Sequence, residues 1–147
     1  MSAVQTATAA EPIRFATYHG QFVYVANVYR GALGRGPEIR ELTNHLYTLA
    51  GQNCSASQAA GLARKIFGSA EFSGLGLNAT QKVTRAYQAV LSRAPDQDGL
   101  AYFVGRLNQG AAISEVAASM AMSPEFADTQ LPAFCTFEMV WPHPYEG

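Results

Sequence analysis

Apolar residues recur with the period of an α-helix along most of this chain. The spacing i, i+3, i+4, i+7 runs through residues 22–33 and returns in residues 83–91, as in amphipathic helices. Two more apolar stripes each follow a proline, a residue suited to a first helical turn. Their members are Ile39, Leu42, Leu46 and Leu49, and then Leu100, Phe103, Val104 and Leu107. No segment alternates with period two for long enough to form a strand, so the pattern predicts an all-α fold.

The helical pattern is repeated within the chain. Residues 29–38 and 87–96 share Tyr, Leu, Arg, Pro and an acidic residue at a constant offset of 58. Farther on, Ser-Ala-Glu-Phe at 69–72 matches Ser-Pro-Glu-Phe at 123–126 at an offset of 54. Self-similarity of this kind indicates duplicated structural units. We therefore predict two tandem three-helix units that pack on a shared core.

The repeat also sets the expected boundaries along the chain. Helical unit 1 is expected over residues 20–73 and helical unit 2 over residues 78–127. Residues 1–19 are small and polar, and we expect them to form a flexible N-terminal arm. Residues 128–147 carry three prolines and several aromatic residues, and we expect an extended C-terminal tail.

Capping residues indicate where some of these helices begin. The third helix of each unit is expected to start at a serine, Ser55 in unit 1 and Ser114 in unit 2, because serine is a favoured N-cap. Asn78 followed by Gln81 resembles a capping pair, in which each side chain satisfies a backbone N–H of the other residue. This pair is expected to open unit 2.

Unit 2 resembles a known family. The pattern Leu-x-Arg-x-Pro-Asp-x-x-Gly-Leu at residues 91–100, the Leu-x-x-Gly at 107–110 and the Ser-x-Glu-Phe at 123–126 look like the domain of unknown function 4214 family. Unit 1 resembles it more weakly, because Glu41 stands where the pattern has Gly99. The resemblance implies a small helical module, found mostly in bacterial and phage proteins. The Arg-x-Pro-Asp turn is also distantly similar to the linker domains of cyanobacterial phycobilisomes, which are typically basic.

The Arg-x-Pro-acid turn favours a structural corner between two helices. An arginine after the first helix can bond its last carbonyls and pair with an acid near the next helix start. Because both units keep the motif, we favour this role over a carboxylate-binding arginine. The corner residues are Arg35, Pro37, Glu38 and Glu71 in unit 1, and Arg93, Pro95, Asp96, Asp98 and Glu125 in unit 2.

No pattern of residues indicates a metal site or an enzyme. Asp96 and Asp98 could start a calcium loop, but too few further oxygen ligands follow, and Asp96 is more simply a helix-start acid. The histidines lack a partner at metal-ligand spacing, and His45 falls on a core stripe opposite Phe103. No local catalytic signature is present. We expect no catalytic residue, no metal and no cofactor.

The tail and the two cysteines leave alternatives open. The tail is too aromatic to be simply solvated, so it either wraps over its own core or docks on a partner, and we favour the partner. Its expected partner-binding residues are Phe134, Phe137, Trp141 and Tyr145. Cys54 and Cys135 fit no metal spacing; a disulfide is possible, and two buried free thiols are favoured.

Composition narrows the classes of function. Only 14% of the 147 residues are charged, the formal net charge is −1, and alanine outnumbers all charged residues together. So few basic residues exclude binding to nucleic acid by charge. No apolar run is long enough for a membrane helix, so no membrane insertion is expected, and no signal peptide is visible. The expected locations of the protein are therefore a cytoplasmic assembly, a virion, or the cell surface after leaderless export.

Together these observations predict a non-catalytic helical module for protein interaction or assembly. We expect self-association or a protein partner within a larger bacterial-surface or virion-type assembly. The alternative is a carbohydrate-binding module associated with bacterial surface polysaccharide, in which Tyr102, Phe103, Trp141 or Tyr145 would stack on sugar rings.

Overall fold

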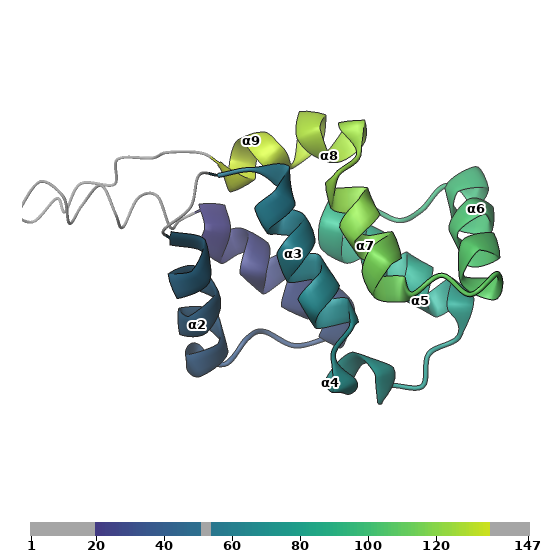
Figure 1. The fold of residues 1–147 in the computed structure, drawn as a ribbon, viewed down its shortest axis with the longest axis horizontal. Coiled ribbons are helices and arrows are strands. Elements are labelled where there is room, and N and C mark those ends of the chain that lie inside the picture. Colours follow the sequence, from purple (N-terminus) through teal and green to yellow (C-terminus); the bar gives the residue numbers. More distant parts are fainter. Residues whose placement is uncertain (1–19, 51–53, 136–147) are drawn as a thin grey trace, which may run out of the picture.

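The computed structural model describes residues 20–50 and 54–135, and all regular structure in these ranges is helical (Figure 1). The predicted all-α fold is confirmed. A helix over residues 20–33 comes first. It is followed by α2 (Ile39–Ala50), α3 (Ala56–Phe67), α4 (Ala70–Ser73), α5 (Ala79–Ala86), the π-helix η1 (Tyr87–Leu91), α6 (Gln97–Asn108), α7 (Ile113–Ala121), α8 (Pro124–Thr129) and α9 (Leu131–Phe134). No helix in the described ranges combines the length and apolarity that crossing a membrane requires.

Side-chain caps fix the starts of several helices. The predicted pair before α5 is confirmed: Gln81 N donates to Asn78 Oδ1 at 2.8 Å, and Asn78 N donates to Gln81 Oε1 at 2.9 Å. The hydroxyls of Ser69 and Ser123 cap α4 and α8, each accepting from the backbone N–H of a phenylalanine three residues later at 3.2 Å. The caps therefore recur at the offset of 54 seen in the sequence.

The centre of the molecule is a pair of alanine-rich helices. Helices α3 and α7 lie side by side in Figure 1 and form the most extensively packed pair of labelled helices. Ala59 and Ala63 on α3, and Ala117 and Ala121 on α7, are buried. Small side chains at a helix contact let the two axes approach closely. The sequence offset of 54 relates these two helices, so equivalent elements meet at the centre.

A second close approach joins the helix over residues 20–33 to η1. A Cβ atom on Gly31 would lie 2.6 Å from the Cα of Ala89, a distance that real Cβ contacts do not reach. Only glycine fits there without moving the two helices apart. Gly31 and Ala89 are related by the offset of 58, so here too equivalent positions face each other.

Helices α2 and α6 lie at opposite ends of the molecule in Figure 1. Helix α6 contains no fully buried residue, and its predicted stripe is only half-buried against the core. On α2, Leu49 is buried, but Ile39 is 84% exposed. The expectation that Ile39 is a core residue is therefore wrong, because α2 is an edge helix and Ile39 lies on its outer side. Phe22 is likewise 44% exposed rather than buried.

Helices α2 and α6 begin after Pro37 and Pro95, as expected, at Ile39 and Gln97. One expected helix start differs. Helix α7 begins at Ile113 with Ala112 at its N-cap, so Ser114 lies inside the first turn and does not cap it. Ser55 does occupy the N-cap of α3, but its side chain makes no capping hydrogen bond.

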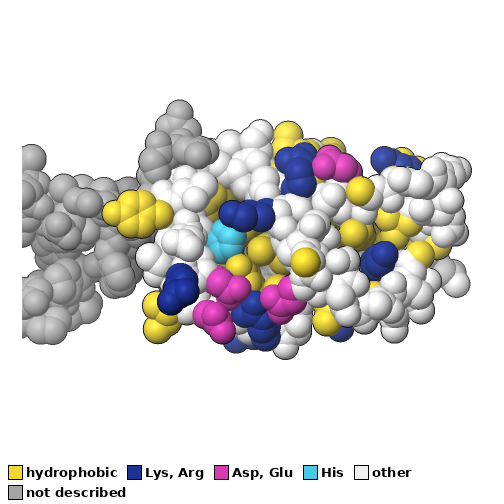
Figure 2. Space-filling model, turned by 60° about the horizontal axis from the view of Figure 1, so that its bottom comes forward, with side chains coloured by type: hydrophobic (Ala, Val, Ile, Leu, Met, Phe, Trp, Pro, Cys, Tyr) yellow, Lys and Arg dark blue, Asp and Glu magenta, His cyan; other side chains and the backbone are white. Residues whose placement is uncertain are grey.

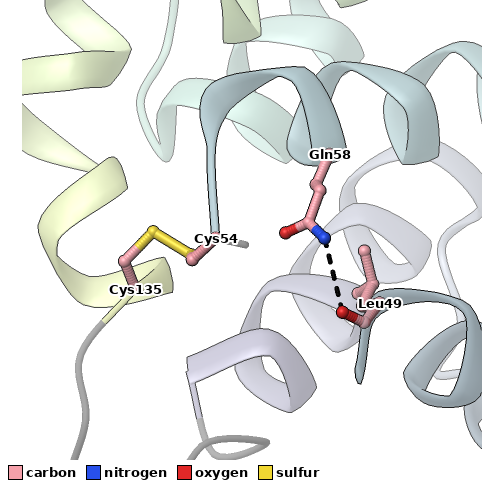
Figure 3. The surroundings of a disulfide bond; sticks show 4 residues. All are labelled: Leu49, Cys54, Gln58 and Cys135. Carbon is pink, nitrogen blue, oxygen red and sulfur yellow. Dashed lines mark hydrogen bonds between the residues drawn. A yellow bond between two sulfur atoms is a disulfide. The ribbon is translucent and has the colours of Figure 1, made fainter. Parts of the chain in front are cut away.

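Cys54 and Cys135 form a disulfide, with their Cα atoms 5.6 Å apart (Figure 3). The interpretation that favoured two free thiols is wrong, because the fold brings the start of α3 against the end of α9. Near this bond, Gln58 Nε2 donates to the carbonyl of Leu49 at 3.3 Å and joins α3 to the end of α2. The disulfide closes a loop with a sequence separation of 81.

We predict that loss of this disulfide lowers the free energy of unfolding by up to about 4.5 kcal/mol, the chain-entropy value for a loop of this length. Urea titrations with and without dithiothreitol measure the effect. The double variant Cys54→Ser, Cys135→Ser should match the reduced parent chain and show no response to reductant. Equal midpoints for the oxidised and reduced parent chain would contradict the expected stabilisation.

Candidate functional site

The corner after η1 is closed by Arg93. Its Nε donates to Glu125 Oε2 at 2.6 Å and its Nη2 donates to Glu125 Oε1 at 2.8 Å, a two-bond arrangement. Its Nη1 donates to the carbonyl of Ala94 at 2.9 Å, and the guanidinium lies 5.0 Å from the ring centre of Tyr87. Asp96 lies farther away, at 3.9 Å. Of the acids that the sequence offers, Glu125 is thus the main partner.

The corner after the helix over residues 20–33 repeats these contacts at Arg35. Its Nε and Nη2 donate to the two carboxylate oxygens of Glu71, both at 2.8 Å. Its Nη1 donates to the carbonyl of Gly36 at 3.0 Å, and the guanidinium lies 5.4 Å from the ring centre of Tyr29. Each arginine therefore ties an interhelical turn to the short helix that carries the matching glutamate.

The two corners differ at one position: the Arg35 corner has Glu41 where the Arg93 corner has Gly99. Arg35 Nη1 and Nη2 donate to the two oxygens of Glu41, both at 2.9 Å. Glu41 Oε1 also accepts from the backbone N–H of Glu38 at 2.8 Å. The sequence interpretation proposed the Glu38 side chain as a partner and missed Glu41. The spacing of an acid three residues into a helix start was the signal that could have found it.

The corresponding place in the second corner is occupied differently. There Asp96 occupies the N-cap of α6 and accepts a hydrogen bond from Gly99 N at 2.7 Å. A Cβ atom on Gly99 would run into the hydroxyl of Tyr87, so a glutamate like Glu41 cannot stand there without a rearrangement. Asp98 lies exposed in the first turn of α6. Pro95 and its counterpart Pro37 are half-buried in the two turns.

The arginine pairs shift the titration of their partners. Hydrogen bonds from Arg35 lower the pKa of Glu41 to about 2 from its usual 4.5, and they also lower the pKa of Glu71. The hydrogen bonds from Arg93 lower the pKa of Glu125 in the same way. Both guanidinium groups are thus held by the chain's own carboxylates.

A buried histidine distinguishes the surroundings of Tyr29 from those of Tyr87. Tyr29 Oη lies 2.8 Å from His45 Nε2, whereas the equivalent Tyr87 packs edge-on against Phe103 with ring centres 6.0 Å apart. Burial lowers the pKa of His45, and the positive charge of Lys65 lowers it further. His45 and Lys65 line a cavity of about 290 Å³ between α2 and α3. Figure 2 shows acidic and basic side chains gathered around a histidine on this face.

No metal centre is formed in the part of the chain that the structure describes. Within residues 20–50 and 54–135, no group of three or more His, Cys, Asp or Glu side chains comes together in a way that could hold an ion. Asp96 uses its Oδ1 atom as a helix cap, and His45 is engaged with Tyr29.

A larger groove lies between α4, the start of α5, and the connection from α6 to α7. Its volume is about 560 Å³. The buried Phe67 and Phe72 border it together with Lys82 and with small or polar residues of α4. Further walls come from residues of the α6–α7 connection. We call this the α4–α5 groove.

The aromatic tail is placed only in part. The prediction that Phe134 binds a partner is wrong: its side chain is 3% exposed, and its ring centre lies 5.0 Å from that of Tyr24. Residues 131–134 form helix α9 rather than an extended chain, because Pro132 falls in the first helical turn, where proline is tolerated. The other predicted partner-binding residues, Phe137, Trp141 and Tyr145, lie outside the described residues.

We predict that Arg93 and Glu125 are coupled by about 1 kcal/mol, because the pair is two-bonded and only about a third exposed. A double-mutant cycle with Arg93→Ala and Glu125→Ala, followed by urea unfolding, measures this coupling. The matched control is the pair of Arg64 and Glu115. These two side chains share one hydrogen bond, and the glutamate side chain is more than half exposed. Their coupling should be about 0.3 kcal/mol. Equal coupling free energies for the two pairs would contradict the expectation that Arg93 and Glu125 stabilise the fold more than an exposed ion pair does.

We predict a loss of stability in acid that depends on Glu41. Because the folded state holds this carboxylate in its ionised form, the contribution is complete above about pH 4.5 and is lost as the pH falls toward 2. Thermal melts between pH 6 and pH 2 should show a shallower decline for Glu41→Gln. Arg35→Gln removes the hydrogen-bonding partner of both Glu41 and Glu71, whose pKa values it lowers, and should give a decline that is shallower still. A parent-like slope in both variants would contradict this assignment.

Comparison with known proteins identifies one family. Residues 63–130 match the family model described as "Domain of unknown function (DUF4214)", which is slightly less than half of the chain. The match runs from within α3 to the end of α8 and so contains most of the central helix pair and the Arg93 corner. No curated protein and no solved structure matches this chain. The match supports the resemblance to this family over the part of the chain that carries its motifs.

Proposed function

We propose that this chain is a non-catalytic helical interaction module that works as a subunit of a larger bacterial-surface or virion-type assembly. The observation that supports this most is the exposure of large apolar side chains on a small domain. Ile39 and Tyr47 on α2 are 84% and 82% exposed, and Tyr102 on α6 is 58% exposed. These side chains provide apolar surface for a protein partner to cover.

We also propose that the chain contains two copies of one unit, over residues 20–73 and 78–127. Recurring contacts support this: an arginine bonded to a glutamate and placed over a tyrosine ring, and a serine cap before a buried phenylalanine. The close contacts between Gly31 and Ala89 and between α3 and α7 join positions that the sequence offsets relate. The distant similarity to phycobilisome linker domains fits a module that joins other proteins.

The disulfide bears on where such an assembly works. Disulfides persist in oxidising environments and are rare in reducing ones. Cys54 and Cys135 are bonded in this fold, and neither is buried. This supports the bacterial-surface or virion-type setting within our proposal over a cytoplasmic one.

A carbohydrate-binding module is the second candidate. One observation favours it: the ring of Tyr102 is 58% exposed and is held edge-on by Phe103, with ring centres 4.9 Å apart. A fixed, exposed ring is the kind of platform on which sugars stack. Loss of glycan binding in Tyr102→Ala, measured on a polysaccharide panel, would favour this candidate over the first.

We predict that the full chain forms a species heavier than 15.8 kDa as its concentration rises, measured by multi-angle light scattering. The triple variant Phe137→Ser, Trp141→Ser, Tyr145→Ser should stay at the monomer mass. Point substitutions are preferable to removal of residues 131–147, because that deletion also removes the buried Phe134 and half of the disulfide.

The control is the thermal melt of the triple variant, which should equal that of the parent chain. A parent chain that stays monomeric over the whole concentration range would contradict the proposed assembly. A triple variant that still associates would show that the exposed apolar residues of the domain, and not the tail, make the contact.

A further inference from the structure

Helix α9 shows what fills one side of this fold. The Phe134 ring packs edge-on against Tyr24, which in turn lies edge-on to Phe126 at 6.0 Å. The end of α9 lies directly against Gly20, since a Cβ atom there would meet the carbonyl oxygens of Ala133 and Phe134. An aromatic residue from the chain's C-terminal end therefore completes the core between the helix over residues 20–33 and α8.

The same place in the other half of the molecule is open. The offsets that relate the two halves carry Tyr24 to Lys82 and Phe126 to Phe72. Phe72 and Lys82 line the α4–α5 groove, whose volume of about 560 Å³ is ample for an aromatic side chain and its neighbours. After α4 the chain turns away through residues 74–77 into α5, so no segment like α9 follows there.

The residues around this groove define the chemistry of its occupant. The half-buried Leu107 and Ile113 provide apolar surface, and the almost completely buried Phe67 and Phe72 also border the groove. Lys82 supplies a positive charge, and no ion pair involves it among the described residues. A segment that carries aromatic residues next to acidic ones is complementary to both features.

Residues 136–147 of this chain have that composition. They hold Phe137 beside Glu138, and Tyr145 beside Glu146, with Trp141 between them. They follow Cys135 at the end of α9, and in Figure 1 α9 and α4 lie at opposite edges of the molecule. A segment that starts at α9 is therefore better placed to enter the groove of a neighbouring molecule than its own.

We propose that the α4–α5 groove receives the aromatic segment 136–147 of a second copy of this chain. This inference rests on the proposed function and deepens it by naming the two surfaces in contact. Because the segment and the groove are different surfaces of one chain, the contact is head-to-tail. Repeated contacts of this kind build rings or open filaments rather than closed two-fold dimers.

Complementation between two full-length variants tests the proposal. The groove variant, Ser73→Arg, places a long cation at the groove wall and keeps its aromatic segment. The segment variant, Phe137→Ser, Trp141→Ser, Tyr145→Ser, keeps its groove. Each variant alone should remain monomeric. An equimolar mixture should form a one-to-one dimer by light scattering, because one intact segment then meets one intact groove.

The fluorescence of tryptophan reports the same event directly. Trp141 is the only tryptophan in the chain, so in the mixture it is present only in the groove variant. Its emission should shift to the blue when the segment variant is added. Adding Lys82→Glu to the segment variant should raise the apparent Kd measured from this shift by about tenfold.

Ser119→Arg is the matched control for the groove variant. Ser73 and Ser119 are both exposed serines whose hydroxyls donate to the carbonyl three residues earlier, at 3.2 and 2.7 Å. Ser119→Arg should associate like the parent chain. Equal thermal melts of both arginine variants, taken at a concentration at which both are monomeric, establish that each is folded. Should Ser73→Arg unfold, Ala79→Glu replaces it as the groove variant.

The outcomes separate the two proposals. An assembly that survives Ser73→Arg, or a mixture in which no dimer forms and Trp141 emission stays unchanged, overturns the groove as the receptor while leaving the assembly intact. A parent chain that is monomeric at all concentrations overturns the proposed function itself. A blue-shifted Trp141 that is lost in a monomeric Ser73→Arg variant, with no change in mass, would show the segment in its own chain's groove and overturn the second copy.

Discussion

The close contact between alanine faces is the constraint on which the rest of this structure depends. Helices α3 and α7 bury several alanines where they pack together, and Gly31 lies so close to the backbone of Ala89 that no side chain would fit between them. Close approach of helix axes requires such small residues at the contact. It also explains the unusual composition, since much of the alanine lies inside the molecule. A larger side chain at Gly31 would separate the two halves that the contact joins.

A centre built from small residues leaves the outer helices with little surface to pack on. Helix α6 buries no residue fully, and on α2 the exposed Ile39 shows how little of the helix faces the core. The arginine corners supply directional bonds where apolar burial is limited. Each ties the turn before an edge helix to the short helix that carries the partner glutamate, α4 or α8. The disulfide adds a covalent tie at the end where α9 closes the fold.

Periodicity and repetition in the sequence were sufficient to predict the helical class. The repeat offered Glu125 to Arg93 and Glu71 to Arg35 only among other acids, because position in a repeat does not say which acid the folded turn brings to the arginine. The repeat could not predict Glu41 as a partner of Arg35, because the residue at the equivalent position in the other corner is Gly99. Nor could it predict which apolar residues of α2 face outward, since a helical stripe does not say how much core is available. The disulfide was missed because its cysteines lie 81 residues apart and only the closed fold brings them together.

The two halves share a plan but differ in how it is completed. In the second, the chain continues past α8 into α9, and Phe134 fills the space beside Tyr24. In the first, the chain after α4 runs on into α5, and among the described residues no segment like α9 follows to fill the corresponding space beside Lys82. The segment 136–147 of a second copy is the occupant that we propose for this space.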